Sequence, residues 1–202
     1  MFDSRIRPLI DPITDAIGRG VSRVGITANM MTIIGGVMGA GAFIAISQSA
    51  YMAGLVLILL NRLADGLDGA VARHQGASDF GGFIDIVFDF IFYALVPLGF
   101  ALADPGNAVA ACFLVVSFIG TGSSFLAFAI MAEKRGLSTA IRGHKSLYYL
   151  GGLTEGAETI AVLVLMCLML VGAGAGAPCS CSSCSCVLPL LIAASCDCSS
   201  VL

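Results

Sequence analysis

Long apolar stretches joined by short polar links are the feature that most constrains this chain. Of its 202 residues, 58% are hydrophobic and only 11% are charged, whereas about a quarter of the residues in a soluble domain are charged. Because so few charged side chains cannot cover a water-facing surface, the bilayer must surround most of the chain. A spanning helix needs about 20 apolar residues, which leaves room for about six spans. We therefore predict one all-α, polytopic membrane domain.

Five spans can be placed on clear apolar runs. They cover approximately residues 30–48, 52–73, 80–102, 107–131 and 146–171. Thr27, just before the first run, is expected to cap its helix. A shorter apolar run at 187–194 is the candidate for the start of a sixth span. The prediction is a bundle of six transmembrane helices.

Residues 1–26 have a different pattern and are predicted to form an amphipathic surface helix. Charged side chains alternate with apolar ones that recur at three- and four-residue steps, namely Ile6, Leu9, Ile10, Ile13, Ile17, Val21 and Val24. Such a helix lies either in the membrane interface or against the protein's own cytosolic face. The sequence does not distinguish these two placements.

The basic residues gather on one side of the expected bundle. All ten Lys and Arg residues precede the first span, lie in or at the end of the second, or fall between the fourth and fifth. The links around residue 49 and at 103–106 carry none. Since positively charged loops stay in the cytoplasm, we predict a multi-pass protein with a cytoplasmic N-terminus.

Four aspartates interrupt the apolar pattern of the second and third spans. Asp65 and Asp68 are three residues apart on one span, and Asp85 and Asp89 are four apart on the next. Each pair shares a helix face, and a tight turn lets the two faces meet. Ionisable side chains at this depth are functional by default, and four neighbouring carboxylates resist ionising together. Two divalent cations would balance the four charges, and oxygen ligands select hard ions such as Mg²⁺ or Mn²⁺.

The residues beside these aspartates suggest phosphate chemistry. A pair of divalent ions suits displacement at phosphorus, because the attacking and leaving oxygens can both be stabilised. Gly66, Gly69 and Ala72 remove side-chain bulk on the same helix, which permits either close helix packing or the approach of a nucleotide. Arg73, one turn beyond Gly69, is placed to hold a diphosphate.

This string resembles the signature of the CDP-alcohol phosphotransferases, also called CDP-alcohol phosphatidyltransferases. The signature runs Asp, two residues, Asp-Gly, two residues, Ala-Arg, a spacer, Gly, three residues, Asp, three residues, Asp. Its fixed positions are filled here by Asp65, Asp68, Gly69, Ala72, Arg73, Gly81, Asp85 and Asp89. The spacer between Arg73 and Gly81 has seven residues, one fewer than usual, and the shortening falls in the turn between the helices.

The resemblance covers roughly residues 27–172 and carries expectations about fold and function. It implies six transmembrane helices, an active site open to the cytoplasm and a homodimer. It implies a phosphatidyl transfer from CDP-diacylglycerol to an alcohol in phospholipid biosynthesis, with release of CMP. Segments 120–125, 144–149 and 154–159 look like a bacterial inner-membrane branch of the family, whose acceptor alcohol the sequence does not identify.

The resemblance also implies roles for the signature residues. The four aspartates would bind two divalent ions, Mg²⁺ or Mn²⁺, and Asp89 would also be the general base for the acceptor hydroxyl. Contacts to the CDP part would come from Gly69, Ala72 and Arg73. Besides CDP-diacylglycerol, the acceptor alcohol and a second copy of the chain, the expected binding partner is membrane lipid. We do not expect the protein to bind nucleic acid.

Two other functions fit parts of the pattern. Within the family, the donor can instead be a small CDP-alcohol and the acceptor a lipid. In another class, the acids would line the pathway of a cation- or proton-coupled transporter, but such sites usually lie near the midplane in discontinuous helices. Here the acids cluster toward one side of the membrane, beside Gly, Ala and Arg, so the enzyme is favoured.

Other polar residues leave alternatives open. Glu155 and Glu158 share a face of the fifth span and either shape the acceptor pocket or pair with Arg62 or Arg142. The basic residues at 142–145 either set the orientation and contact lipid headgroups or bind a phosphate of the acceptor.

Residues 173–202 form an anomalous tail rich in Gly, Cys and Ser. Six of the eight cysteines lie between positions 179 and 198, largely alternating with serine. Such crowding is typical of a thiolate metal site or of disulfides. The repeats also fit a frameshifted reading of GC-rich coding sequence, which would have degraded the sixth span. Resequencing of the gene tests that hypothesis.

Overall fold

The computed structural model describes residues 14–76, 78–135 and 156–172, and these form helices and turns with no strand among them. The all-helical prediction is therefore confirmed for this part of the chain. A helical segment at residues 14–23 is followed by α2 (Ala28–Ser47), α3 (Tyr51–Gln75), α4 (Asp79–Ala103), the short 3-10 helix η1 (Pro105–Asn107), α5 (Ala108–Lys134) and α6 (Gly156–Gly172).

Among the described residues, three segments are long and apolar enough to cross a membrane: α2, α4, and the stretch from Pro105 to Met131 that contains η1 and most of α5. α3 is as long as α4, with 25 residues, and reaches about 38 Å. It therefore also exceeds the hydrocarbon thickness of about 30 Å, although its charged residues make it more polar. The residues before α6 and the expected sixth span lie outside the described part, so the count of six spans stays a prediction.

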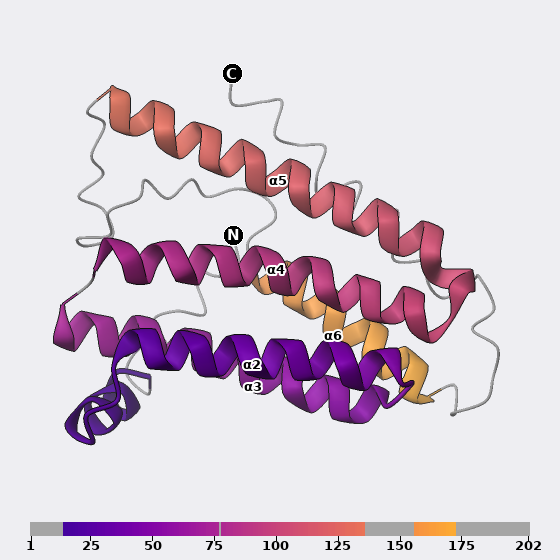
Figure 1. The fold of residues 1–202 in the computed structure, drawn as a ribbon, viewed down its shortest axis with the longest axis horizontal. Coiled ribbons are helices and arrows are strands. Elements are labelled where there is room, and N and C mark those ends of the chain that lie inside the picture. The colour runs from indigo at the N-terminus through magenta and orange to yellow at the C-terminus, as the bar shows by residue number, and fades with distance from the viewer. Residues whose placement is uncertain (1–13, 77, 136–155, 173–202) are drawn as a thin grey trace.

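The helices lie side by side in an up-and-down bundle in which α2 packs against both α3 and α4 (Figure 1). α5 packs on α4, and α6 packs on α3. The core between α2, α3 and α4 is built from fully buried apolar side chains, including Ile46, Ile58 and Val96. Large apolar side chains on the outer faces, such as Val37 and Val116, stay exposed, as expected for helices that contact lipid.

Local signals set the ends of the helices that carry the aspartates. Thr27 caps α2, as predicted, by accepting a hydrogen bond from the backbone N–H of Met30 at 3.3 Å. α3 ends before Gly76, whose φ of +96° is a conformation that favours glycine. Ser78 then caps α4 by accepting from the N–H of Gly81 at 3.0 Å. This short connection places the end of α3 and the start of α4 at the same end of the bundle (Figure 1).

The helical residues 14–23 pack against α3. Gly18 lies directly against Ala70, and Val21 packs on a second buried cluster formed by Met31, Ala64 and Leu67. Ile17 and Val24 remain exposed. The described part of the predicted surface helix therefore rests on the protein's own face and turns some apolar side chains outward. Residues 1–13 lie outside the described part.

A methyl group at position 18 should displace this segment. A Cβ there would lie 2.8 Å from Ala70 Cβ and 3.2 Å from the Ala70 carbonyl carbon, and overpacking of this kind costs about 1–3 kcal/mol. We expect Gly18→Ala to speed hydrogen–deuterium exchange of residues 14–23 by about tenfold, measured by mass spectrometry in detergent. Gly20→Ala is the matched control, because no atom outside its own stretch of helix lies within 4 Å of its Cβ position. Equal exchange in the two variants would contradict this docking.

Candidate active site

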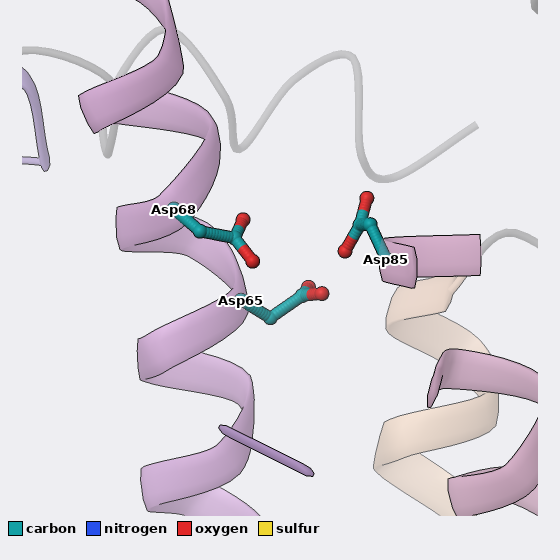
Figure 2. A group of neighbouring side chains, drawn as sticks. All are labelled: Asp65, Asp68 and Asp85. Atoms are coloured by element: carbon teal, nitrogen blue, oxygen red, sulfur yellow. The ribbon is translucent and has the colours of Figure 1, made fainter. Parts of the chain in front are cut away.

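Three aspartates meet between α3 and α4. Asp65 and Asp68 extend from successive turns of α3, and Asp85 approaches from α4 (Figure 2). One carboxylate oxygen from each lies within 4.8 Å of those from the other two. Asp68 is buried, whereas Asp65 and Asp85 are half-buried. The two helix faces predicted from the aspartate spacing thus meet at these three residues.

Asp68 is held by a hydroxyl group from α2. Thr32 Oγ1 donates to Asp68 Oδ2 at 2.7 Å, and it also lies 3.1 Å from the carbonyl oxygen of Ala28 in its own helix. A buried carboxylate needs such a partner, because leaving its oxygens without hydrogen bonds is costly. Thr32 could not be recognised from the sequence as part of the site, since no spacing pattern connects position 32 with position 68.

Asp89, the fourth aspartate of the signature, forms an ion pair with Arg62. Arg62 Nη2 donates to Asp89 Oδ1 at 2.7 Å, and Nη1 lies 3.5 Å from Asp65 Oδ2. The guanidinium group is itself fixed, because its Nε donates to Asn61 Oδ1 at 2.8 Å and its Cζ lies 4.6 Å from the ring centroid of Phe92. The sequence placed Arg62 near the site but did not indicate which acidic residue it contacts.

A single pocket between α2, α3 and α4 brings the four aspartates together. Its lining consists of Thr32, Gly35, Gly36, Asn61, Arg62, Asp65, Asp68, Asp85, Phe88 and Asp89. The lack of a side chain at Gly36 is required here, since a Cβ would lie 2.6 Å from the Phe88 ring. On the other side, Asn61 Nδ2 donates to the carbonyl oxygen of Gly35 at 2.8 Å. α2 therefore approaches both acidic helices closely enough to close one side of the pocket.

The residues predicted to contact CDP lie together toward the end of α3. A Cβ on Gly69 would lie 3.8 Å from Arg73 Nη1, and Ala72 is half-buried. Arg73 is exposed and donates to Asp15 Oδ1 from Nη2 at 2.6 Å and from Nε at 3.1 Å. The hydrogen bond and charge of Arg73 hold the pKa of Asp15 below its usual value. The nucleotide contact of Arg73 and its neighbours stays a prediction.

Several polar residues singled out in the sequence lie outside the described residues. These are Glu155, the side chain of Glu158, the basic residues at 142–145 and the cysteine-rich tail. Their predicted roles are therefore untested. Arg62, one of the two partners expected for the glutamates, pairs with Asp89 and Asp65 within the described part.

Comparison with known proteins gives consistent results. A family model for CDP-alcohol phosphatidyltransferase matches residues 25–194. The chain is 52% identical over 165 residues to the inner membrane protein YnjF of Escherichia coli, covering 81% of this chain and 80% of that protein. Its fold is similar to that of the phosphatidylinositol phosphate synthase of Mycobacterium tuberculosis with CDP-DAG bound, with a TM-score of 0.65 and 26% identity over 91% of this chain and 88% of that one. The same synthase in complex with manganese and citrate aligns with a TM-score of 0.64 and 24% identity, over 90% and 83% of the two chains.

These results confirm the family that the aspartate signature resembles, and they favour the enzyme over the transporter. The converging carboxylate oxygens of Asp65, Asp68 and Asp85 are the hard ligands that Mg²⁺ and Mn²⁺ prefer, so the donor set fits a divalent ion. The predicted transferase class is thus confirmed, and so is a divalent metal as a cofactor used in the family. The chain, a membrane protein with apolar spanning helices, belongs to the CDP-alcohol phosphatidyltransferase family of phospholipid biosynthesis.

Proposed function

We propose that this chain transfers a phosphatidyl group from CDP-diacylglycerol to an alcohol and releases CMP. The convergence of Asp65, Asp68 and Asp85 from two helices, with Asp89 in the same pocket, carries this proposal. The likeness to a synthase solved with CDP-DAG supports the donor. The name of that synthase makes an inositol phosphate the first acceptor to test.

Seven of the eight signature residues have a role in this proposal. The four aspartates would hold two divalent ions, and these ions would stabilise the charge on the phosphate oxygens. Asp89 accepts the proton of the acceptor hydroxyl. The hydroxyl oxygen then bonds to the lipid-side phosphorus as the bond between that phosphorus and CMP breaks. Arg73 pairs with the diphosphate, and Gly69 and Ala72 leave room for the nucleotide beside it.

The proposed orientation places the site at the cytoplasmic end of the bundle, with the N-terminus inside. Arg19 and Arg23 precede α2, Arg73 lies in the last turn of α3, and Lys134 lies in the last turn of α5. These helix ends lie at the same end of the bundle (Figure 1), and positive residues favour the cytoplasmic side. A soluble acceptor and CMP then exchange with the cytoplasm. The bacterial inner membrane as location and a homodimeric assembly complete the proposal.

Removing one carboxylate should abolish turnover. We expect Asp68→Asn and Asp89→Asn each to lower CMP release at least about a hundredfold, because a metal ligand or the proton acceptor is lost. The assay follows labelled CMP from CDP-diacylglycerol with a panel of polyols and polyol phosphates.

Asp104→Asn is the control for these variants, since Asp104 only caps η1 through the N–H of Gly106 at 2.9 Å. Full turnover in either site variant would refute the assigned roles. Turnover only with a small CDP-alcohol and diacylglycerol would favour the reverse arrangement of donor and acceptor.

Thr32 should support metal binding through Asp68. Thr32→Val removes the donor to Asp68 Oδ2 and keeps the branched shape of the side chain. Loss of a hydrogen bond to a metal ligand typically costs about 10–100-fold in affinity, so we expect Mn²⁺ affinity to fall about tenfold by isothermal titration calorimetry. Thr121→Val is the control, because Thr121 is exposed and its hydroxyl donates within its own helix, to the carbonyl oxygen of Ser117 at 3.0 Å. Unchanged affinity in Thr32→Val would argue against a metal at Asp68.

Asp15 and the diphosphate should compete for Arg73. Both side chains of this pair are more than a third exposed, and an exposed ion pair is worth at most about 1 kcal/mol. We therefore expect Asp15→Asn to lower the KM for CDP-diacylglycerol about two- to threefold, an effect that about 1 M salt should remove. Asp79→Asn removes an exposed charge at the same end of the bundle and serves as control. A KM that rises in Asp15→Asn would contradict the contact of Arg73 with CDP.

A further inference from the structure

Arg62 places a fixed positive charge among the carboxylates. Its guanidinium group contacts Asp89 at 2.7 Å and Asp65 at 3.5 Å. Only 16% of the Arg62 side chain is exposed, against 31% for Asp89 and 35% for Asp65. Arg62 therefore reaches from the three-carboxylate cluster of Asp65, Asp68 and Asp85 to the remaining aspartate of the pocket.

More than charge keeps Arg62 in place. Its Nε donates to Asn61, and Nη1 donates to the Tyr93 hydroxyl at 3.4 Å. Its Cζ lies 4.6 Å from the ring centroid of Phe92 and 5.7 Å from that of Tyr93. Asn61 is itself anchored to the backbone of Gly35 in α2. A planar guanidinium group held on several sides stays in one orientation, unlike a solvated lysine ammonium group.

We propose that Arg62 is a positioning residue that holds Asp89 and competes with the second divalent ion for that carboxylate. This inference rests on the proposed function, because it takes the aspartates as the metal ligands. The three-carboxylate cluster, whose oxygens already converge within 4.8 Å, takes the first ion. Any ion drawn to Asp89 must share that carboxylate with Arg62.

The charges explain why the two ions bind unequally. One divalent ion and Arg62 bring three positive charges to the four negative ones of the pocket. The second ion then enters a site with little remaining negative charge and a cation already in contact with Asp89 and Asp65. Like charges at such short range repel strongly, so the second ion binds more weakly than the first.

The test is a titration of the purified full-length protein with Mn²⁺ alone, without nucleotide or acceptor. Isothermal titration calorimetry and the electron paramagnetic resonance signal of free Mn²⁺ both count the ions bound. For the wild type we expect one tight and one weaker site. Arg62→Met removes the charge and the guanidinium group and leaves a shorter, unbranched apolar side chain beside Phe92. We expect it to tighten the weaker site about tenfold and to change the tight site little.

Three further variants separate charge from packing. Arg62→Lys keeps a positive charge and should keep the weaker site weak. Arg62→Gln keeps a donor toward Asp89 without the charge and should tighten the weaker site as Arg62→Met does, which repeats the test if the methionine variant does not fold. Arg23→Met removes an exposed arginine of the segment at residues 14–23 and should leave both sites unchanged.

The possible results can be told apart. An unchanged weaker site in folded Arg62→Met and Arg62→Gln would overturn the inference and leave the proposed function standing. Loss of both sites in those variants would also overturn it, because Arg62 would then support the fold of the site instead of competing with an ion. Absence of any Mn²⁺ binding by the wild type would overturn the proposed function and this inference together.

Discussion

Four aspartate carboxylates share one pocket between α2, α3 and α4, and their mutual repulsion is the constraint on which the surrounding structure depends. Two unit charges roughly 4 Å apart interact by about 4 kcal/mol at an effective dielectric constant of about 20. The cluster of Asp65, Asp68 and Asp85 alone contains three such pairs. Arg62 and Thr32 offset part of this repulsion through their contacts with Asp89, Asp65 and Asp68. The repulsion that remains is what gives the pocket its attraction for divalent cations.

The packing of α2 follows from the same constraint. Polar partners can reach the aspartates only if α2 comes close to both acidic helices, and small residues make this possible. The carbonyl oxygen of Gly35 accepts a hydrogen bond from Asn61. The Phe88 ring packs against Gly36, where a Cβ would collide with the ring. A larger side chain at position 36 would push α4 outward and carry Asp85 away from α3. The glycines of α2 are thus part of the site, although they carry no chemistry.

How much of this could be predicted depends on whether a property is local. Apolar run length placed α2, α3 and α4 within a few residues of their ends, and Thr27 was recognised as a cap, because both signals lie within one segment. The aspartate spacing fixed which residues share a helix face for the same reason. The contacts of Thr32 and Arg62 could not be predicted, since they depend on how far each helix is rotated about its axis and how closely it approaches its neighbours. The three- and four-residue intervals between the aspartates show which of them share a helix face, but they do not show toward which neighbouring helix that face is turned.

Two arginines on α3 show how burial within the protein separates otherwise similar side chains. Arg62 and Arg73 are eleven positions apart, about 16 Å along the helix, and each contacts an aspartate from another segment. The Arg62 pair is largely shielded, so breaking it would leave a desolvated charge without a partner, which is strongly unfavourable. The Arg73 pair is exposed, and water readily replaces either partner at little cost. The largely shielded Arg62 is therefore suited to hold a carboxylate in place, and the exposure of Arg73 suits the proposed exchange of Asp15 for an incoming phosphate.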